Sequence, residues 1–240
     1  MSSPKHRYLV LSGGGIRGVT YLGALQAWLS VSPNALNELQ GVAGASAGAV
    51  TALLLSLPLS MSCLALLVND HQLWHTVVNP HGWPLLVSQW GLCDTTHFER
   101  MLCRAMCWAF PERLATAVDA QRLTFAELYH LTKRELAVSV TNVSRDAVEY
   151  HSTHTTPEYP VVRSVLASMS MPFVFTPQRH GSNTWVDGGL LDNVPVGNFP
   201  LAETMVWVLD GSSSQPVQQP SSLFDYSFRL LQMASNELQR

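Results

Sequence analysis

The stretch Gly44-Ala45-Ser46-Ala47-Gly48 lies between a short apolar run and a long apolar helical pattern. It has the form G-x-S-x-G, in which small residues flank a serine on both sides. Small residues suit a sharp strand-to-helix turn, because a Cβ there would clash with neighbouring backbone. The helix that follows directs free N–H groups toward the serine, and a nearby base could make its hydroxyl a nucleophile. Taken alone, the pattern fits a nucleophile and a purely structural turn equally well.

A second glycine-rich motif, residues 13–18, also follows an apolar run and precedes a helical pattern. As G-x-G-x-x-G it fits a dinucleotide-binding fingerprint, with Glu38 as the acidic residue. That acid should end the second strand, whereas Glu38 precedes the second apolar run. As an oxyanion hole, consecutive glycine N–H groups would point at one oxygen, and Arg17 would add positive charge. A nucleophile at Ser46 needs such a partner and favours the second interpretation.

A third motif, Asp187-Gly188-Gly189, follows a run with strand character. The glycines keep the approach to the carboxylate open, so Asp187 could accept the proton of Ser46 directly. An Asp-Gly turn is the commoner role of this dipeptide and stays the structural alternative. Asp192 is a rival base, but its neighbours in the sequence favour a turn.

The positions of the histidines separate two kinds of serine hydrolase. None of the 9 histidines lies beyond His180. The chain order Ser, acid, His would need residues such as Ser46, Asp146 and His180, and would leave Asp187 without a role. A two-residue Ser46–Asp187 dyad gives a role to each of the three motifs described above.

Composition excludes some classes of protein. Charged residues make up 13% of the chain, below the roughly 25% that is usual, and the net charge is −3. Nucleic-acid binding is therefore not predicted. The four cysteines lack the density of a secreted disulfide scaffold, and the first apolar run is too short for a signal peptide, so we expect an intracellular, cytoplasmic protein. Pro58 divides the uncharged stretch 51–68 into two helices, which favours buried helices over a membrane span.

Alternation of apolar runs with helical patterns predicts an α/β fold with a mostly parallel sheet. Strands are expected at about residues 7–12, 40–44, 136–143, 147–152, 184–186 and 204–209. Helices are expected at about residues 19–29, 47–57, 60–73, 95–110, 161–169 and 222–238, with a short helix from the capping box at Thr124. We predict one domain over residues 1–240, with a core at 8–209, a variable lid-like segment at 71–123 and the terminal helix at 222–238.

The three motifs together resemble the patatin-like phospholipases, a family of serine lipid acyl hydrolases. That family carries G-G-G-x-[RK]-G, G-x-S-x-G and D-G-[GA], which match residues 13–18, 44–48 and 187–189. Weaker family patterns match at residues 124–128, 136–142, 167–175 and 192–196, so the resemblance runs from about Tyr8 to Leu209. Met171 departs from the pattern, because many members have a smaller residue before the proline.

The resemblance implies a three-layer α/β/α fold and hydrolysis of phospholipids or related lipids without a metal or cofactor. It implies Ser46 as nucleophile and Asp187 as base, acting in two acyl-transfer steps. Its other implied site residues are an oxyanion hole at Gly13, Gly14, Gly15, Arg17 and Gly18, elbow glycines at Gly44 and Gly48, and base-flanking glycines at Gly188 and Gly189. The alternatives are a catalytically silent lipid-binding protein of the same fold and a dinucleotide-binding oxidoreductase that uses residues 13–18. The oligomeric state is left open.

Residues 71–92 are rich in histidine, tryptophan and proline. They could form a membrane-facing lid, with Trp83 and Trp90 at the level of the lipid head groups, or a packed loop whose aromatic rings fill the core. The low charge of the chain favours peripheral membrane contact.

Three cysteines and a histidine, Cys93, His97, Cys103 and Cys107, lie close together in sequence and could suggest zinc. Zinc ligands usually come in closely spaced pairs on turns, whereas Cys103 and Cys107 lie four residues apart on a predicted helix. Core packing is therefore predicted for them.

Overall fold

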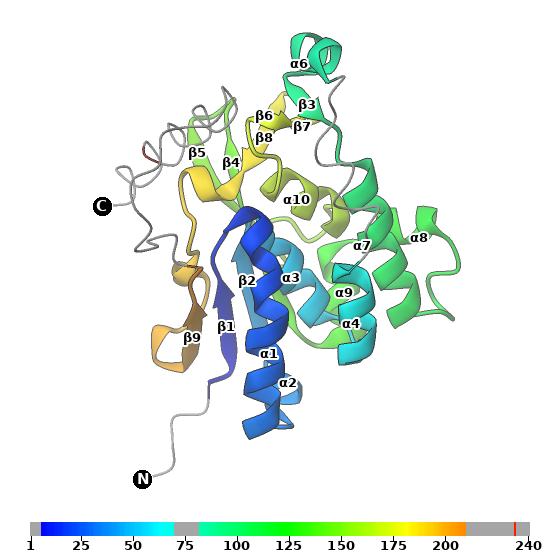
Figure 1. Cartoon of the computed structure of the whole chain (residues 1–240), viewed down its shortest axis with the longest axis vertical. Coiled ribbons are helices and arrows are strands. Elements are labelled where there is room, and N and C mark those ends of the chain that lie inside the picture. The colour runs from blue at the N-terminus through cyan, green and yellow to red at the C-terminus, as the bar shows by residue number, and fades with distance from the viewer. Residues whose placement is uncertain (1–5, 70–81, 210–232, 234–240) are drawn as a thin grey trace.

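Parallel strands form the centre of a sheet in the computed structural model, whose described residues are 6–69, 82–209 and 233 (Figure 1). In spatial order these strands are β9 (Thr204–Trp207), β1 (Tyr8–Leu11), β2 (Gly41–Ala45) and β4 (Glu135–Asn142). β1 and β2 consist of apolar or small residues, and every residue of β2 is buried. Strands of this kind are typical of a sheet that is covered on both faces.

The far half of β4 is flanked by antiparallel strands. β5 (Ala147–Ser152) pairs along one edge of β4, and β8 (Asn183–Asp187) pairs along the edge that β2 occupies. Along that shared edge Ala45 lies opposite Ser139, and Asp187 lies opposite the next residue, Val140. β2 and β8 therefore run toward each other, and their carboxyl ends meet.

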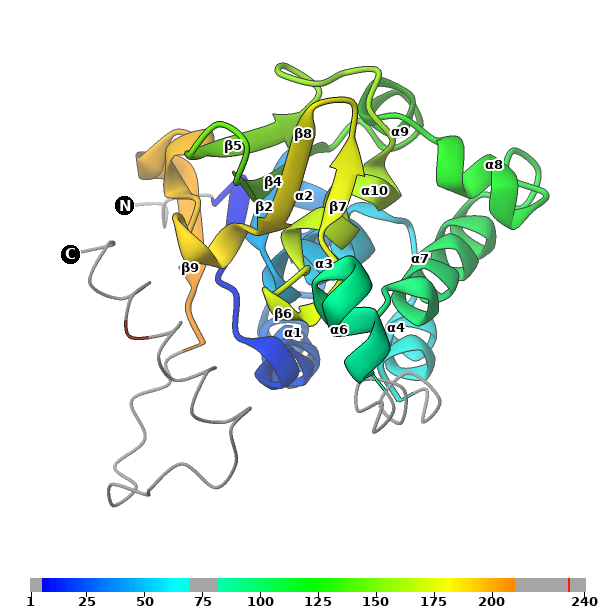
Figure 2. The same cartoon turned by 90° about the horizontal axis from the view of Figure 1, so that it is seen from above.

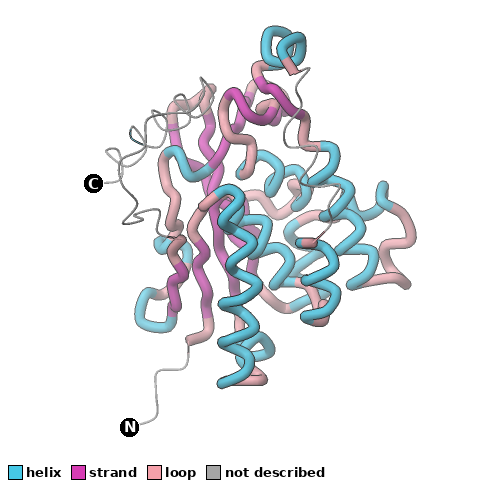
Figure 3. Tube along the Cα trace, in the orientation of Figure 1, coloured by secondary structure: helices cyan, strands magenta, loops and turns pink. Residues whose placement is uncertain are grey.

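The predicted fold class is confirmed. β7 (Gln178–His180) pairs antiparallel with β8, so five of the seven strands described in the main sheet point the same way, and only β5 and β8 are reversed. One face is covered by helices that share the main buried core, visible beside the strands in Figure 3. They are α1 (Thr20–Val31), α3 (Ala47–Ser56), α4 (Met61–Val68), α7 (Thr96–Ala109) and α10 (Val161–Ser168).

The second face has a thinner cover. Val10, Ala43 and Ala137 form a small buried cluster there with Phe199. The chain from β8 to β9 supplies this layer with three short 3-10 helices, η2 (Gly188–Leu190), η3 (Val196–Asn198) and η4 (Leu201–Glu203). Figure 2 shows this segment on the side of the sheet opposite α1, α3 and α4.

The remaining elements are short. They are η1 (Gly15–Val19), α2 (Ala35–Glu38), α6 (Trp83–Gln89), β3 (Gly91–Cys93), α8 (Ala117–Arg122), α9 (Phe125–Thr132) and β6 (Phe173–Phe175). β3 and β6 form a separate parallel pair, with Gly91 opposite Phe173. Within the described residues no helix combines the length and apolarity needed to cross a bilayer.

Several expected elements differ from those observed. Part of the segment expected to be irregular forms α6 and β3, because Pro84 is tolerated in the first turn of a helix. β3, β6 and β7 are three residues long, too short to show a periodicity. The segment 71–123 is only partly lid-like, since Leu102, Met106 and Leu123 are buried in the main core. The predicted helix at 222–238 lies outside the described residues apart from Met233, as does the end of the helix predicted at 60–73.

The guanidinium of Arg134 links the carboxyl ends of two helices to the start of β4. The half-buried guanidinium of Arg134, just before β4, donates hydrogen bonds to the carbonyl oxygens of Leu36, Leu39 and Leu55. Those carbonyls lie in α2, just after it, and in the last turn of α3. A helix leaves its last carbonyl groups short of internal partners, and Arg134 supplies a charged donor to them.

Candidate active site

Ser46 occupies a sharp turn between β2 and α3. Its φ of 52° and ψ of −124° are strained for a residue with a side chain. A Cβ added to Gly44 would lie 2.3 Å from the carbonyl carbon of Gly48, and one added to Gly48 would lie 2.3 Å from the Leu11 oxygen. The turn is thus pressed against the end of β1, which explains why glycines flank the serine at these two positions.

Asp187 lies directly beside Ser46. The Ser46 hydroxyl donates to Oδ2 of Asp187 over 2.6 Å, and Oδ1 accepts from the Gly189 N–H over 2.8 Å. Ser46 is 7% exposed and Asp187 is 1% exposed. A Cβ on Gly188 would lie 2.0 Å from the Ser139 oxygen, so the base-flanking turn packs on β4. The meeting of β2 and β8 therefore brings together two residues that are 141 positions apart in sequence.

The carboxylate of Asp187 is tuned by its surroundings. Burial raises its pKa to about 6, against the opposing effect of the hydrogen bonds from Ser46 and Gly189. A carboxylate with this pKa is a stronger base than an exposed one and is still mostly ionised at pH 7. It can accept a proton and return it.

Hydrogen bonds from neighbouring elements hold the backbone of both residues. The Ser46 N–H donates to the Ser168 hydroxyl over 2.9 Å, and that hydroxyl donates to the Ser139 carbonyl over 2.6 Å. The Asp187 N–H donates to the Ser170 carbonyl over 3.0 Å, and the Thr141 hydroxyl donates to the Asp187 carbonyl over 2.9 Å. Sequence analysis gave no role to Ser168 or Thr141. The only signal for Ser168 was its place in a weak family pattern.

The glycine-rich loop lies on the other side of Ser46. A Cβ added to Gly13 would lie 3.0 Å from the Ser46 Cβ and 2.4 Å from the Asn193 Oδ1. The Gly13 N–H donates to the Asn193 carbonyl over 3.2 Å, and the Arg17 Nε donates to the Gly14 carbonyl over 3.4 Å.

Two backbone N–H groups of the glycine loop are available to bind an oxyanion. Within the described part of the chain, no acceptor is found for the N–H groups of Gly14 and Gly15. Gly15 has a φ of 55°, and a Cβ on Gly18 would lie 2.7 Å from the Cβ of Ala47, the first residue of α3. Of the predicted oxyanion residues, Gly14 and Gly15 therefore have the uncommitted donors, whereas Gly13, Arg17 and Gly18 shape the loop.

The rival bases lie elsewhere. Asp192 accepts from the Tyr150 hydroxyl over 2.6 Å and from the Val194 N–H over 3.2 Å, as expected for a turn residue. Asp146 is exposed in the turn between β4 and β5, and His180 packs against Tyr159. Among the residues that the structure describes, no hydrogen bond joins Ser46 to a histidine.

A second serine and histidine pair is buried in the interior. The His151 Nδ1 and the Ser164 Oγ are 2.6 Å apart, and the His151 Nε2 is 3.6 Å from the Glu149 carboxylate. Burial lowers the pKa of His151, although Glu149 acts in the opposite direction. Ser164 is fully buried, so this triad-like arrangement offers no surface to a substrate and serves the packing of α10 on β5.

The cysteine cluster packs as predicted. Cys93 and Cys103 are buried in the main core, and Cys107 is partly buried against it. Burial, with help from Glu99 and Cys107, raises the pKa of Cys103 to about 12, so this thiol stays protonated at neutral pH. No group of three or more potential metal ligands is found among the described residues.

Trp83 and Trp90 lie on the surface. Their side chains are 61% and 57% exposed, and Val87 between them on α6 is also exposed. The Arg179 guanidinium stacks over the Trp90 ring, 3.9 Å from its centroid. These two rings therefore do not fill the core, contrary to the packed-loop interpretation of this segment.

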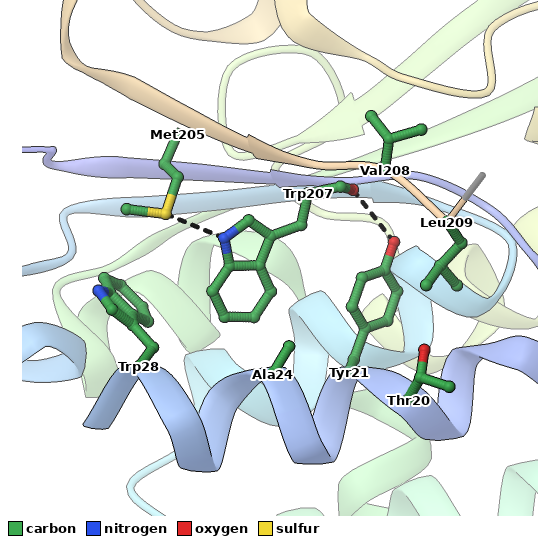
Figure 4. A pocket seen from close by; sticks show the side chains of 8 residues that line it. All are labelled: Thr20, Tyr21, Ala24, Trp28, Met205, Trp207, Val208 and Leu209. Carbon is green, nitrogen blue, oxygen red and sulfur yellow. Dashed lines mark hydrogen bonds between the residues drawn. The ribbon is translucent and has the colours of Figure 1, made fainter. Parts of the chain in front are cut away.

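An open groove borders the glycine loop (Figure 4). It has a volume of about 430 Å³ and lies between α1 and the edge strand β9. It is lined by Thr20, Tyr21, Ala24, Trp28, Met205, Trp207, Val208 and Leu209. The Tyr21 hydroxyl donates to the carbonyls of Ser12 and Trp207, and Leu209 packs on Gly14. The groove lies beside the glycine loop, and neither Ser46 nor Asp187 lines it.

Comparison with known proteins gives the family of the chain. The probable lipid hydrolase 463L of Invertebrate iridescent virus 6 is 28% identical over 197 residues, which cover 80% of this chain and 63% of that protein. VipD from Legionella pneumophila is similar in structure, with a TM-score of 0.58 and 24% identity over 85% of this chain and 50% of VipD. The complex of SpcU with ExoU from Pseudomonas aeruginosa gives a TM-score of 0.54 and 21% identity, over 98% of this chain and 51% of the matched chain.

These comparisons also show that the chain spans about half to two thirds of the length of the proteins it matches. The two solved structures are distant enough that they establish the fold alone. The model of the patatin-like phospholipases matches residues 9–199, a range that contains the glycine loop, the serine turn and Asp187. The chain therefore belongs to the patatin-like phospholipase family.

Proposed function

We propose that this chain hydrolyses acyl esters of phospholipids or related lipids, with Ser46 as nucleophile and Asp187 as base. The observation that carries the proposal is the 2.6 Å hydrogen bond from the Ser46 hydroxyl to the buried carboxylate. The lipid substrate is supported by the family and by a viral relative whose name is that of a lipid hydrolase. Because the chain spans only part of its relatives, its own activity is inferred from the site.

In the first step Asp187 takes the proton of Ser46 while Oγ attacks the ester carbonyl carbon. The N–H groups of Gly14 and Gly15 hold the developing oxyanion, helped by the positive end of α3, which begins at Ala47. The intermediate then collapses, the protonated Asp187 gives its proton to the departing alkoxide, and an acyl-Ser46 ester remains.

In the second step water replaces the alcohol. Asp187 takes a proton from the water as its oxygen attacks the acyl carbon, and the same amides hold the second oxyanion. The fatty acid leaves, Ser46 Oγ recovers its proton from Asp187, and the site returns to its starting state. Every proton in this scheme passes through Asp187, and no metal or cofactor takes part.

The direct test measures acyl release from mixed phospholipid vesicles by wild type and Ser46→Ala, each with and without a chelator. We expect Ser46→Ala to lose activity by roughly a thousandfold or more, and chelation to have no effect. Ser30→Ala removes an exposed hydroxyl on α1 and serves as the matched control. Release that chelation abolishes would contradict metal-independent hydrolysis.

The silent lipid-binding alternative makes a different prediction. An activated fluorophosphonate should label Ser46 in a hydrolase and leave it unmodified in a binding protein. The dinucleotide interpretation has lost its support, because Glu38 ends α2, ahead of β2, and does not follow the second strand.

The exposed tryptophans suggest how the enzyme reaches its substrate. Tryptophan side chains favour the boundary between lipid and water, and Arg179 places a cation beside Trp90. We therefore propose peripheral contact with a lipid surface through Trp83 and Trp90. In vesicle sedimentation the double variant Trp83→Ala/Trp90→Ala should lose most of its binding.

Trp108 offers a matched control for that measurement. It is 45% exposed on α7, and the Arg104 guanidinium lies 5.5 Å from its ring centroid. Trp108→Ala should bind vesicles as wild type does. If the double variant bound vesicles as well as wild type does, the proposed membrane contact would be wrong.

A further inference from the structure

The geometry of the serine turn points to a second functional residue. We propose that Ser168 is the positioning residue of the nucleophile, and that its hydroxyl holds the backbone of Ser46 in the reactive conformation. This inference rests on the proposed function, because it concerns how Ser46 is kept ready to react.

Ser168 is the last residue of α10, and its side chain is fully buried. A serine hydroxyl has one donor, and here that donor is committed to the Ser139 carbonyl over 2.6 Å. The oxygen is therefore left to accept, and it accepts the Ser46 N–H over 2.9 Å. The two bonds join α10, β4 and the turn after β2 at a single atom.

The turn needs this support because its conformation is unfavourable. A non-glycine residue with a φ of 52° keeps that angle only where contacts with its surroundings fix the backbone. The Ser46 amide is enclosed by protein, and a buried N–H that lacks an acceptor is costly. Removal of the Ser168 hydroxyl would take the acceptor from this N–H and a donor from the Ser139 carbonyl. The turn could then relax and carry Oγ away from the carboxylate of Asp187.

The two members of the dyad are held by different groups. Ser168 acts on Ser46, whereas the backbone of Asp187 is held by the Ser170 carbonyl and the Thr141 hydroxyl. Loss of Ser168 should therefore lower the reactivity of Ser46. Because the hydrogen bond from Ser46 lowers the pKa of Asp187, movement of Oγ away from the carboxylate should also shift the ionisation of Asp187 to higher pH. A variant that merely loosened the whole fold would admit water to Asp187 and shift its ionisation to lower pH.

Ser56 provides a matched control at the far end of α3 from Ser46. Its side chain is buried, and its hydroxyl donates to the Ala52 carbonyl over 2.8 Å, within its own helix. Ser56→Ala removes that bond and touches neither Ser46 nor Asp187. The pair Ser168→Ala and Ser56→Ala thus removes the same atom from two buried places, and only one of them touches the nucleophile.

The first measurement is the rate of fluorophosphonate labelling of Ser46, together with kcat and KM on a soluble ester. We expect Ser168→Ala to lower the labelling rate and kcat by about 10- to 100-fold, with KM unchanged and the midpoint of the pH profile raised. Ser56→Ala should stay within about threefold of wild type, and Ser168→Thr, which keeps the hydroxyl, should recover part of the loss. Equal losses in the two alanine variants, or no loss in Ser168→Ala, would overturn the proposal.

The second measurement does not depend on activity. Amide hydrogen exchange at Ser46, followed by NMR, should be faster in Ser168→Ala and unchanged in Ser56→Ala. If wild type shows neither fluorophosphonate labelling nor hydrolysis while amide exchange at Ser46 still changes as expected, the proposed function is wrong. The role of Ser168 in fixing the Ser46 backbone is then supported. If exchange at Ser46 is unchanged, the role of Ser168 is wrong whatever the activity. Should Ser168→Ala not fold, Ser168→Cys keeps the shape with a weak donor and takes its place.

Discussion

At the scale of single residues, the proposed chemistry depends on proton transfer between Ser46 and Asp187. Most carboxylates are weak bases at neutral pH, because water stabilises their charge. Here burial raises the pKa of Asp187 to about 6, and two hydrogen bonds keep the ionised form accessible. In the proposed mechanism, desolvation of Asp187 supplies the basicity that a histidine supplies in other serine hydrolases.

The first prediction concerns pH. Since the base must be ionised to accept a proton, kcat/KM should rise as pH increases through about 6 and level off above about 7. The measurement is a pH profile from 4.5 to 8.5 on a soluble ester, which avoids changes in lipid charge. A midpoint near 4, the ordinary value of an exposed carboxyl group, would show that Asp187 is not the base.

The second prediction concerns stability. Because the pKa of Asp187 is raised in the folded protein, its contribution to stability is full below the unfolded pKa of about 3.9 and is lost as pH rises through about 6. Asp187→Asn removes the buried charge and should therefore raise the free energy of unfolding at pH 8 by about 1–3 kcal/mol, with little gain at pH 4. Denaturant titrations at the two pH values would measure it. A loss of stability for Asp187→Asn at pH 8 would contradict the argument.

At the scale of elements, the serine turn is a close contact between three pieces of backbone. Gly44 allows the start of α3 to lie against the end of β2, and Gly48 allows α3 to lie against the last residues of β1. Neither position has room for a side chain, and the obstructing atoms belong to the backbone, which cannot rotate away.

The third prediction follows from that contact. Gly48→Ala would place a Cβ 2.3 Å from the Leu11 carbonyl oxygen, so we expect severe loss of stability or of soluble protein, and loss of activity in whatever folds. Gly23→Ala, in α1, meets nothing within 4 Å and should stabilise the protein by about 0.5–1 kcal/mol, as expected for an exposed helix position. Thermal unfolding of both variants is the measurement. Normal stability of Gly48→Ala would mean that the turn is not packed in this way.

Sequence patterns predicted the elements that are long or marked by chemistry. The apolar runs of β1 and β2, the capping box before α9 and the three glycine motifs each carry a local signal, and their boundaries agree with the structure to within one or two residues. β3, β6 and β7 carry no such signal, because three residues cannot establish a period. The role of Ser168 could not be predicted from its neighbours, since it depends on contacts with residues 29 and 122 positions away.

The reversed direction of β8 could not be predicted from the sequence either. A strand with Asp187 at its end could have paired parallel with the rest, and the alternation of strands and helices favoured that arrangement. Only the register on β4 shows that β8 runs against β2, so that both chemical groups end at the same place. The motifs thus predicted which residues to examine, and the topology explains why they meet.

At the scale of the whole molecule, Arg134 links the start of β4 to the ends of α2 and α3. Its guanidinium donates to three carbonyl groups that belong to the far end of the helical layer from the serine turn. Such a contact can stabilise the fold without touching the chemistry.

The fourth prediction tests this separation. Arg134→Ala should lower the free energy of unfolding by about 1.5–3 kcal/mol, because buried carbonyls lose a charged donor. The folded fraction should keep the kcat of wild type. Arg100→Ala, at an exposed position of α7, is the control and should change stability by less than about 0.5 kcal/mol. A fall in kcat at unchanged stability would show that the two ends of the layer are coupled.

The end-to-end meeting of β2 and β8 has a consequence during synthesis. Ser46 leaves the ribosome well before Asp187, which follows 141 residues later. At roughly 5–20 residues per second, the growing chain spends about 7–28 s with its serine made and its base still missing. A nascent or prematurely terminated chain of this length therefore cannot attack the lipids around it. If Ser46 and Asp187 form the catalytic pair, as proposed above, hydrolytic activity appears only after β8 has been made.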